Sequence, residues 1–407
     1  MQERVTKAVI TASYNDDGKN GPIKDLVMDQ VETERAKGYK FINHLFLRDT
    51  HDHRDTKFNF LIAGVPLVVY AMFNTARTSL EQVAVVGDDT TRQLVDAFVD
   101  HYQDPRFVFV DEGPPEDWSL SGTIRKGSGA LEASRGELSL ALMGDTPFAW
   151  NLEHVLADPD IPDNDAILDF NTKRKVGRHF PRYYHFNVQR GAAHLAAKEP
   201  NLYLFDTVKI AEIADVVYSG RKANLGKGRK DTLIELFVQN GKWKKTLAGL
   251  GPVYSAQLGF AFASKRVKPL VKPRRMSQAI QNALGLNIVF KADNDQPGTL
   301  EDMDAFEDWV YFTEMLRTGG NDAYPYHTQI QEFAQRVMPT LQREIPLYSD
   351  FEGYMNGLFT EVELPIPFPD GQNFEMPFKE GRYKRMIKGT VRDHRRYNRK
   401  NALAIKR

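Results

Sequence analysis

Asp145 is the first residue whose type and position point to chemistry. It follows an apolar run over 138–143 (LSLALM), which predicts a buried strand, and it lies in the turn Gly144-Asp145-Thr146-Pro147. In parallel α/β sheets, ligands bind beyond the carboxyl ends of the strands. A carboxylate at such an end is predicted to face a ligand, so Asp145 is the first candidate functional residue.

A second stretch that could bind a ligand lies at 168–184 (LDFNTKRKVGRHFPRYY), where basic residues are interleaved with aromatic ones. Cationic and aromatic side chains together suit a phosphorylated small molecule, and they also suit single-stranded nucleic acid. The same composition is found on ordinary solvated surfaces. These readings stay open at the level of sequence.

The composition excludes several kinds of chemistry. The 407 residues include no cysteine, which rules out disulfides, Cys-ligated zinc, iron–sulfur clusters and a thiol nucleophile. Lys plus Arg equals Asp plus Glu at 54 each, so the chain as a whole has no general attraction to polyanions. The longest apolar stretch, 60–73, is too short to span a bilayer, and the run at 8–12 is too short for a signal peptide. We therefore expect a soluble cytoplasmic protein.

The elements that would position Asp145 alternate between strands and helices. Valine-rich runs at 82–86 and 107–110 predict strands, and Leu94, Val95 and Phe98 lie between them at helical spacing. Strand, helix, strand at this spacing predicts βαβ units, and hence a mostly parallel sheet with helices on both faces. Further strands are predicted at 7–12, 138–143, 166–170, 201–205, 287–291 and, less clearly, 256–263; helices are predicted from residue 131 and over 277–284, 304–317 and 327–344.

Several segments, in the same order along the chain, resemble the nucleotidyltransferases that make nucleotide sugars and related compounds. This family includes the sugar-phosphate nucleotidylyltransferases and the molybdopterin guanylyltransferases. The similar segments are KFNFLIAGVPLVVYAM (57–72), QVAVVGDD (82–89), RKGSGALEAS (125–134), LSLALMGDTPF (138–148), Glu199-Pro200-Asn201 and LEDMDAFEDW (300–309). They resemble, in turn, the family's Lys and Gly-x-Pro-Leu segment, second strand, Gly-rich segment, Gly-Asp-x-Pro turn, sugar-contacting Glu-x-Asn and late Asp-x-Asp motif. The matches cover about residues 57–316.

This resemblance implies a Rossmann-like α/β fold of the nucleotide-diphospho-sugar transferase type. It also implies Mg²⁺-dependent transfer of a nucleoside monophosphate from a nucleoside triphosphate to a phosphorylated acceptor such as a sugar phosphate, with release of pyrophosphate. Asp145 and Asp304, or Asp302, would hold the Mg²⁺, because Mg²⁺ takes hard oxygen ligands together with substrate phosphates. Lys57 would place a positive charge against the phosphates of the nucleotide. The remaining site residues implied by the resemblance are Gly64, Gly127, Ser128 and Gly129 for the nucleotide, and Arg178, Glu199 and Asn201 for the acceptor.

One part of the family pattern is missing. In the family the first strand ends in a Gly-rich loop with an arginine, which wraps the triphosphate. Here the first strand is predicted at 7–12 and is followed by SYNDDGKNG, while a second candidate at 41–47 is followed by RDTHDHRDT. Neither loop carries the expected glycines. Two alternatives therefore stay open, namely a nucleotide-sugar-dependent glycosyltransferase of the GT-A type and a non-catalytic nucleotide-binding member.

The chain is predicted to have two parts. Residues 1–320 would form the nucleotidyltransferase-like α/β domain, with an insertion at about 13–56, and residues 321–407 a helical extension with a basic tail. From Lys379 onward there are 12 basic residues and two acidic ones. Three interpretations of this tail stay open: a solvated appendage, a segment that contacts anionic lipid or nucleic acid, and a segment that packs against an acidic face of its own domain.

Overall fold

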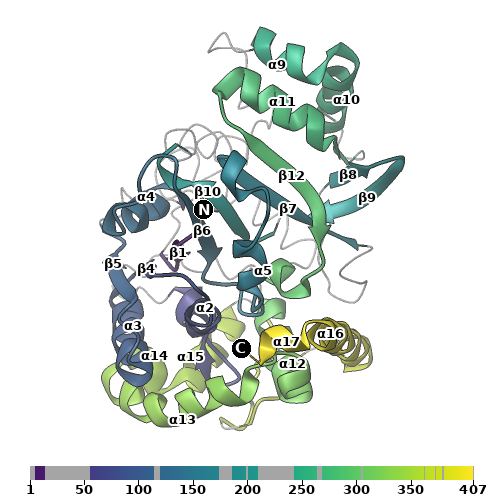
Figure 1. Ribbon diagram of the computed structural model, residues 1–407. Helices are drawn as coiled ribbons and strands as arrows, with labels where there is room; N and C mark the ends of the chain where they lie inside the picture. Colours follow the sequence, from purple (N-terminus) through teal and green to yellow (C-terminus); the bar gives the residue numbers. More distant parts are fainter. Residues whose placement is uncertain are drawn as a thin grey trace.

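The computed structural model is an α/β protein built on one large mixed sheet (Figure 1). It describes residues 5–13, 56–113, 120–173, 186–198, 200–209, 243–263, 268–303, 306–361, 363–371, 373–377 and 380–406. Four parallel strands form one half of the sheet in the order β5-β4-β1-β6. Their bounds are β1 Lys7–Thr11, β4 Gln82–Gly87, β5 Phe107–Asp111 and β6 Leu138–Met143.

Beyond β6 the sheet contains strands of both directions. β10 runs antiparallel to β6, β7 runs antiparallel to β10, and β12 runs parallel to β7. β9 pairs with the end of β7 and is followed by β8 and β11. The bounds are β7 Ala166–Thr172, β8 Phe186–Arg190, β9 Ala193–Lys198, β10 Leu202–Asp206, β11 Leu270–Val271 and β12 Ile288–Asn294.

Helices cover both faces of the parallel strands because alternate residues of each strand point to opposite sides. In β1, Ala8 and Ile10 belong to the large core shared with α2 (Leu67–Ala76) and α3 (Asp89–Tyr102), whereas Val9 packs with Leu131 on the face covered by α4 (Leu120–Ala130). The predicted fold class, a mostly parallel sheet with helices on both faces, is confirmed.

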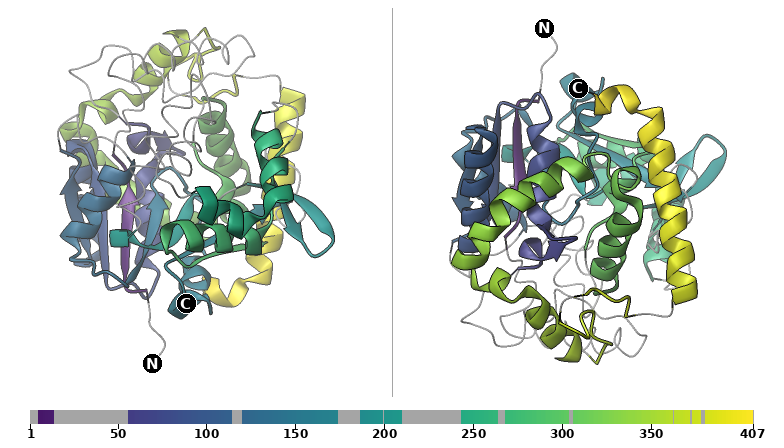
Figure 2. Two further views of the ribbon diagram at one scale, coloured as in Figure 1. Left: turned by 90° about the horizontal axis from the view of Figure 1, so that it is seen from above. Right: turned by 90° about the horizontal axis from the view of Figure 1, so that it is seen from below.

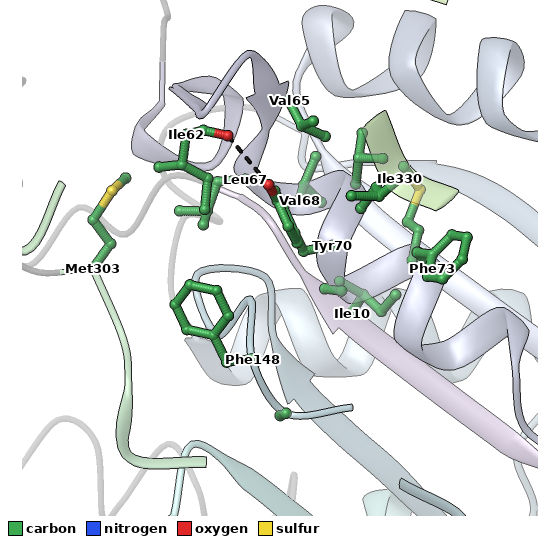
Figure 3. Packing of buried hydrophobic residues seen from close by; sticks show 14 of the residues in the cluster. Ile10, Ile62, Val65, Leu67, Val68, Tyr70, Phe73, Phe148, Met303 and Ile330 are labelled. Atoms are coloured by element: carbon green, nitrogen blue, oxygen red, sulfur yellow. Dashed lines mark hydrogen bonds between the residues drawn. The ribbon is translucent and has the colours of Figure 1, made fainter. Parts of the chain in front are cut away.

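The C-terminal helices extend the core on the side of α2. Ile330 of α13 packs in one cluster with Ile10 of β1 and Tyr70 of α2 (Figure 3). Residues on either side of position 320 therefore share a core, and the predicted division of the chain at that position stays a prediction. The helices concerned are α12 Phe306–Gly319, α13 His327–Glu344, α14 Pro346–Ser349, α15 Phe351–Glu361, α16 Glu380–Lys400 and α17 Ala402–Ile405.

Two element predictions are wrong. The helix expected from Leu131 is α4, which ends at Ala130, and the possible strand at 256–263 is part of the helix α10. α10 lies with α9 and α11 in a group of helices beyond β12 (Figure 1). The bounds of these helices are α9 Trp243–Leu250, α10 Pro252–Ala263 and α11 Pro273–Leu284. The candidate strand at 41–47 lies outside the described residues.

The long helix α16 lies along the outside of the molecule (Figure 2). Its inner side, which includes Ile387, Val391 and His394, is buried, and its outer side is formed by exposed basic residues. Over 380–400 the sequence has nine basic and two acidic residues. The predicted contact of this tail with anionic lipid or nucleic acid stays a prediction. Within the described residues, none of the helices combines the length and apolar character needed to cross a bilayer.

Candidate functional site

Lys57 and Asp145 meet at the carboxyl end of the central strands. The Lys57 ammonium lies 2.5 Å from Asp145 Oδ2, and each side chain is about nine-tenths buried. Asp145 is the second residue after β6, at the strand end that the sequence predicted, and Gly144 before it donates its N–H to Thr11 O at the end of β1. This is the edge of a parallel sheet at which ligands bind.

Lys57 begins a short 3₁₀ turn, η2 (Lys57–Asn59), which is fastened to the sheet by its last residue. Asn59 Nδ2 donates to both carboxylate oxygens of Asp88 at 3.0 and 3.1 Å, and Asp88 also caps α3 by accepting from Thr91 N–H. Burial raises the pKa of Asp88, while the hydrogen bonds from Thr91 and Asn59 oppose that rise. The cap of one helix therefore also positions the lysine.

The segment at 299–303 passes across the ends of β6 and β10 and completes the site. Asn201 donates its N–H to Thr299 O, and Met303 donates its N–H to Asp145 O. The carbonyl of Met303 in turn accepts from Lys57 Nζ at 2.7 Å. Residues 300–303, the described start of the late acidic motif, are thus brought against the turn that holds Asp145, although more than 150 residues separate them.

A second lysine–aspartate pair flanks the first. Lys198, the last residue of β9, lies 2.9 Å from Asp302 Oδ1 and also donates to Leu300 O at 3.3 Å. Both side chains are largely buried. Sequence reasoning missed Lys198, although it directly precedes the Glu199-Pro200-Asn201 segment, because nothing in the sequence connects it with Asp302.

Three residues beside these pairs carry buried polar atoms that lack a hydrogen-bond partner within the described ranges. They are Thr56 Oγ1, Thr146 Oγ1 and Asn201 Nδ2. Thr56 and Thr146 adjoin Lys57 and Asp145 in sequence. A buried polar atom without a partner costs about 1–3 kcal/mol, so such atoms mark places where water or a polar ligand is expected.

The predicted nucleotide-binding residues occupy two different places. Gly127, Ser128 and Gly129 lie in α4, where a Cβ on Gly127 would come 2.5 Å from Val9 and the Ser128 hydroxyl donates to Ile124 O. Gly127 therefore permits close packing of helix on sheet. Gly64 forms the turn between the short strands β2 (Leu61–Ile62) and β3 (Val65–Pro66), with φ +83°. Nucleotide binding by these residues stays a prediction.

Other predicted site residues lie outside the described ranges. They are Asp304, Arg178 and Glu199. Asp302 lies inside them and is paired with Lys198.

The described side chains of the site offer the carboxylate of Asp145 as a ligand for Mg²⁺. No group of three or more metal-ligating side chains is present in the part of the chain that the structure describes. Mg²⁺ is usually bound by one or two carboxylates together with substrate phosphates, and Asp145 offers a carboxylate at the correct edge of the sheet. The residues therefore fit an ion that arrives with a phosphate ligand, with Asp145 as its protein ligand.

A fully buried pair, Glu301 and His394, connects the 299–303 segment to helix α16. His394 Nε2, on α16, lies 2.9 Å from both carboxylate oxygens of Glu301, and neither side chain is exposed to solvent. The C-terminal helix is thus connected to the residues immediately before Asp302 and Met303.

No protein-family model and no curated protein matches the chain. Similar solved structures include a hypothetical transferase from Thermus thermophilus, 16% identical, which covers 75% of this chain and 99% of that one at a TM-score of 0.44. A 4-diphosphocytidyl-2C-methyl-D-erythritol synthase from Anaerococcus prevotii is 11% identical and covers 77% and 96% at 0.35. A putative glucose-1-phosphate thymidylyltransferase from Bacillus anthracis is 9% identical and covers 51% and 74% at 0.33.

Proposed function

We propose that the protein is a nucleotidyltransferase, which transfers a nucleoside monophosphate from a nucleoside triphosphate to a phosphorylated acceptor such as a sugar phosphate. The observation that carries the proposal is the buried Lys57–Asp145 pair at the carboxyl end of β6. Nucleotidyl transfer needs little covalent chemistry from the protein. It requires alignment of the attacking oxygen and neutralisation of phosphate charge, which buried lysines next to carboxylates can supply.

In this proposal Lys57 binds a phosphate oxygen of the nucleotide, while Asp145 and the carbonyl of Met303 hold its ammonium in place. The distances of 2.5 and 2.7 Å support a fixed position for the Lys57 Nζ atom. Lys198 provides a second positive charge, oriented by Asp302, for a phosphate of the acceptor. Asn201 Nδ2, which is buried and has no partner among the described residues, would donate to an acceptor hydroxyl.

Mg²⁺ is part of the proposal as a companion of the triphosphate. Asp145 would be its ligand from the described part of the chain, with Asp304 as the further candidate. When bound, the ion would neutralise charge that develops on the phosphates. The protein groups retain their own tasks, because Lys57 and Lys198 bind and orient phosphate whether or not the ion is present.

The test is pyrophosphate release by the purified chain with Mg²⁺, each of the four common nucleoside triphosphates and a panel of sugar phosphates. We expect Lys57→Met and Asp145→Asn each to lower kcat/KM by about 10²–10³-fold, the usual effect of removing one charge-stabilising group from an active site. Cleavage of nucleotide sugars without use of a triphosphate would instead support the glycosyltransferase alternative. Nucleotide binding without turnover would support a non-catalytic protein.

Lys7→Met is the matched control, because Lys7 forms a similar ion pair at the opposite end of β1. Its ammonium lies 2.9 Å from Glu137 Oε2, and it also donates to Glu132 O. This substitution removes a lysine–carboxylate pair from the amino end of the same strands. We expect it to leave kcat/KM within about twofold of the original, because Lys7 lies at the end of β1 opposite to the proposed site. An equal loss in the Lys7 and Lys57 variants would contradict the proposed site.

A further inference from the structure

A pocket of about 380 Å³ lies apart from the Lys57–Asp145 site. Its walls come from the β2–β3 hairpin, from α12, α13 and α15, and from Phe368, Asn373 and Phe374. Neither Lys57, Asp145, Lys198 nor Met303 lines it. Its volume falls within the range of small-molecule sites in proteins, about 300–1,000 Å³.

Two opposite charges line this pocket without pairing. Arg317 of α12 and Glu352 of α15 both belong to its wall, and no ion pair joins these two described residues. The Arg317 guanidinium donates through Nη1 to Phe374 O at 3.0 Å and lies over the Phe374 ring. That contact orients the guanidinium and leaves its other N–H groups for a carboxylate. A pocket with one cation and one anion that do not neutralise each other suits a ligand that carries both charges.

The pocket also contains polar atoms that have no hydrogen-bond partner among the described residues. Thr313 Oγ1 is buried and has no hydrogen-bond partner within the described residues, and the same holds for His327 Nδ1. Thr313 lies on α12 one turn before Arg317, so both face the pocket from the same side of the helix. Burial lowers the pKa of His327, so its imidazole is neutral at pH 7 and can exchange a hydrogen bond with a ligand.

The remaining wall is aromatic and held in place before any ligand binds. The Trp309 ring makes edge-on or tilted contacts with Phe351, Phe368 and Phe374 at centroid distances of 5.7–6.3 Å. Trp309 Nε1 donates to Leu61 O at 2.8 Å, which fastens the hairpin to α12. A wall of this kind binds an apolar body at low entropic cost, because its side chains are already ordered.

We propose that this pocket binds a free amino acid with an apolar or aromatic side chain. The carboxylate contacts Arg317 and Thr313, the ammonium contacts Glu352, and the side chain packs on the aromatic wall around Trp309. Small ligands with few atoms bind with dissociation constants of about 10 μM to 10 mM, and we expect a value in this range. The site requires neither a nucleotide nor catalytic activity.

The test is calorimetric titration of the full chain with L-phenylalanine and L-leucine, followed in parallel by tryptophan fluorescence. We expect saturable binding of at least one of them, and binding at least tenfold weaker for 3-phenylpropanoate and phenethylamine, which each lack one charge. Arg317→Gln and Glu352→Gln should each weaken binding at least tenfold. Arg343→Gln, which removes an exposed arginine on α13 that bonds main-chain Pro339 O, should not.

The Trp309→Phe variant tests whether the ligand lies against Trp309. It should abolish the fluorescence change on binding, while binding measured by calorimetry persists. The proposal is overturned if neither amino acid binds at concentrations up to about 10 mM, the upper end of the expected range of dissociation constants. It is also overturned if the singly charged analogues bind as well as the amino acids, or if the Arg317 and Glu352 variants bind normally. These results are independent of pyrophosphate release.

Discussion

The buried pair between His394 and Glu301 allows a quantitative prediction about how the C-terminal helix is attached. His394→Leu removes the imidazole that bonds both oxygens of the Glu301 carboxylate, at a site where neither side chain reaches solvent. Breaking a buried pair by removing one partner costs about 3–5 kcal/mol, because the remaining group stays buried without compensation. We expect the free energy of unfolding to fall by about that amount.

The double variant Glu301→Leu/His394→Leu distinguishes this reason from a simple packing defect. Replacing both partners of a buried pair with apolar residues is often neutral or stabilising, so the double variant should recover most of the loss. The measurement is urea unfolding of the original chain and the two single and one double variants, followed by fluorescence and far-UV circular dichroism. The reasoning is refuted if His394→Leu costs less than about 1 kcal/mol, or if the two single losses add in the double variant.

Three further predictions concern packing, pH and the position of Lys57. Gly127→Ala should lower the free energy of unfolding by about 1–3 kcal/mol, because the new Cβ would collide with Val9. In the same helix, a Cβ at Gly129 would meet no atom within 4 Å, so Gly129→Ala should be neutral or stabilising by up to about 1 kcal/mol. Equal urea midpoints for the two variants would contradict this prediction. Burial lowers the pKa of His327 in the folded state, so below about pH 6.5 the unfolded chain binds more protons than the folded chain. The free energy of unfolding therefore falls as the pH drops through that region. His327→Gln should reduce the fall in the free energy of unfolding between about pH 7.5 and 5.5. Asn59→Ala removes the donor to Asp88 that fastens the turn of Lys57, and should lower kcat/KM more than Lys7→Met does in the same pyrophosphate assay.

The strands β1, β4 and β6 of the parallel half could be predicted because they are buried on both faces. Runs such as QVAVV and LSLALM are short, continuous and apolar, and they correspond to β4 and β6 within a residue or two. α4 was misplaced because its glycines are weak helix formers and its helical state depends on packing against β1 and β4. The run VYSAQLGFAFA is apolar without a clear period, so it could not be distinguished from a strand, yet it is part of α10.

In the candidate site too, some residues could be predicted from the sequence and others could not. Asp145 could be placed from the sequence because a strand end is a local signal, whereas Lys57 was a candidate only because its segment resembles the Lys and Gly-x-Pro-Leu segment of the nucleotidyltransferases. The Lys198–Asp302 and Glu301–His394 pairs join residues 104 and 93 positions apart. Such pairs depend on how β7, β9 and α16 are arranged in space, which spacing along one sequence does not determine.

The charge of α16 has a practical consequence for purification. The chain as a whole is electrically balanced, with 54 basic and 54 acidic residues, so the rest of the protein must be acidic to the same extent that this helix is basic. An ion-exchange resin responds to the local surface that touches it and not to the average. We therefore expect the protein to adsorb to both cation and anion exchangers near neutral pH, in different orientations, and to elute from each at moderate salt.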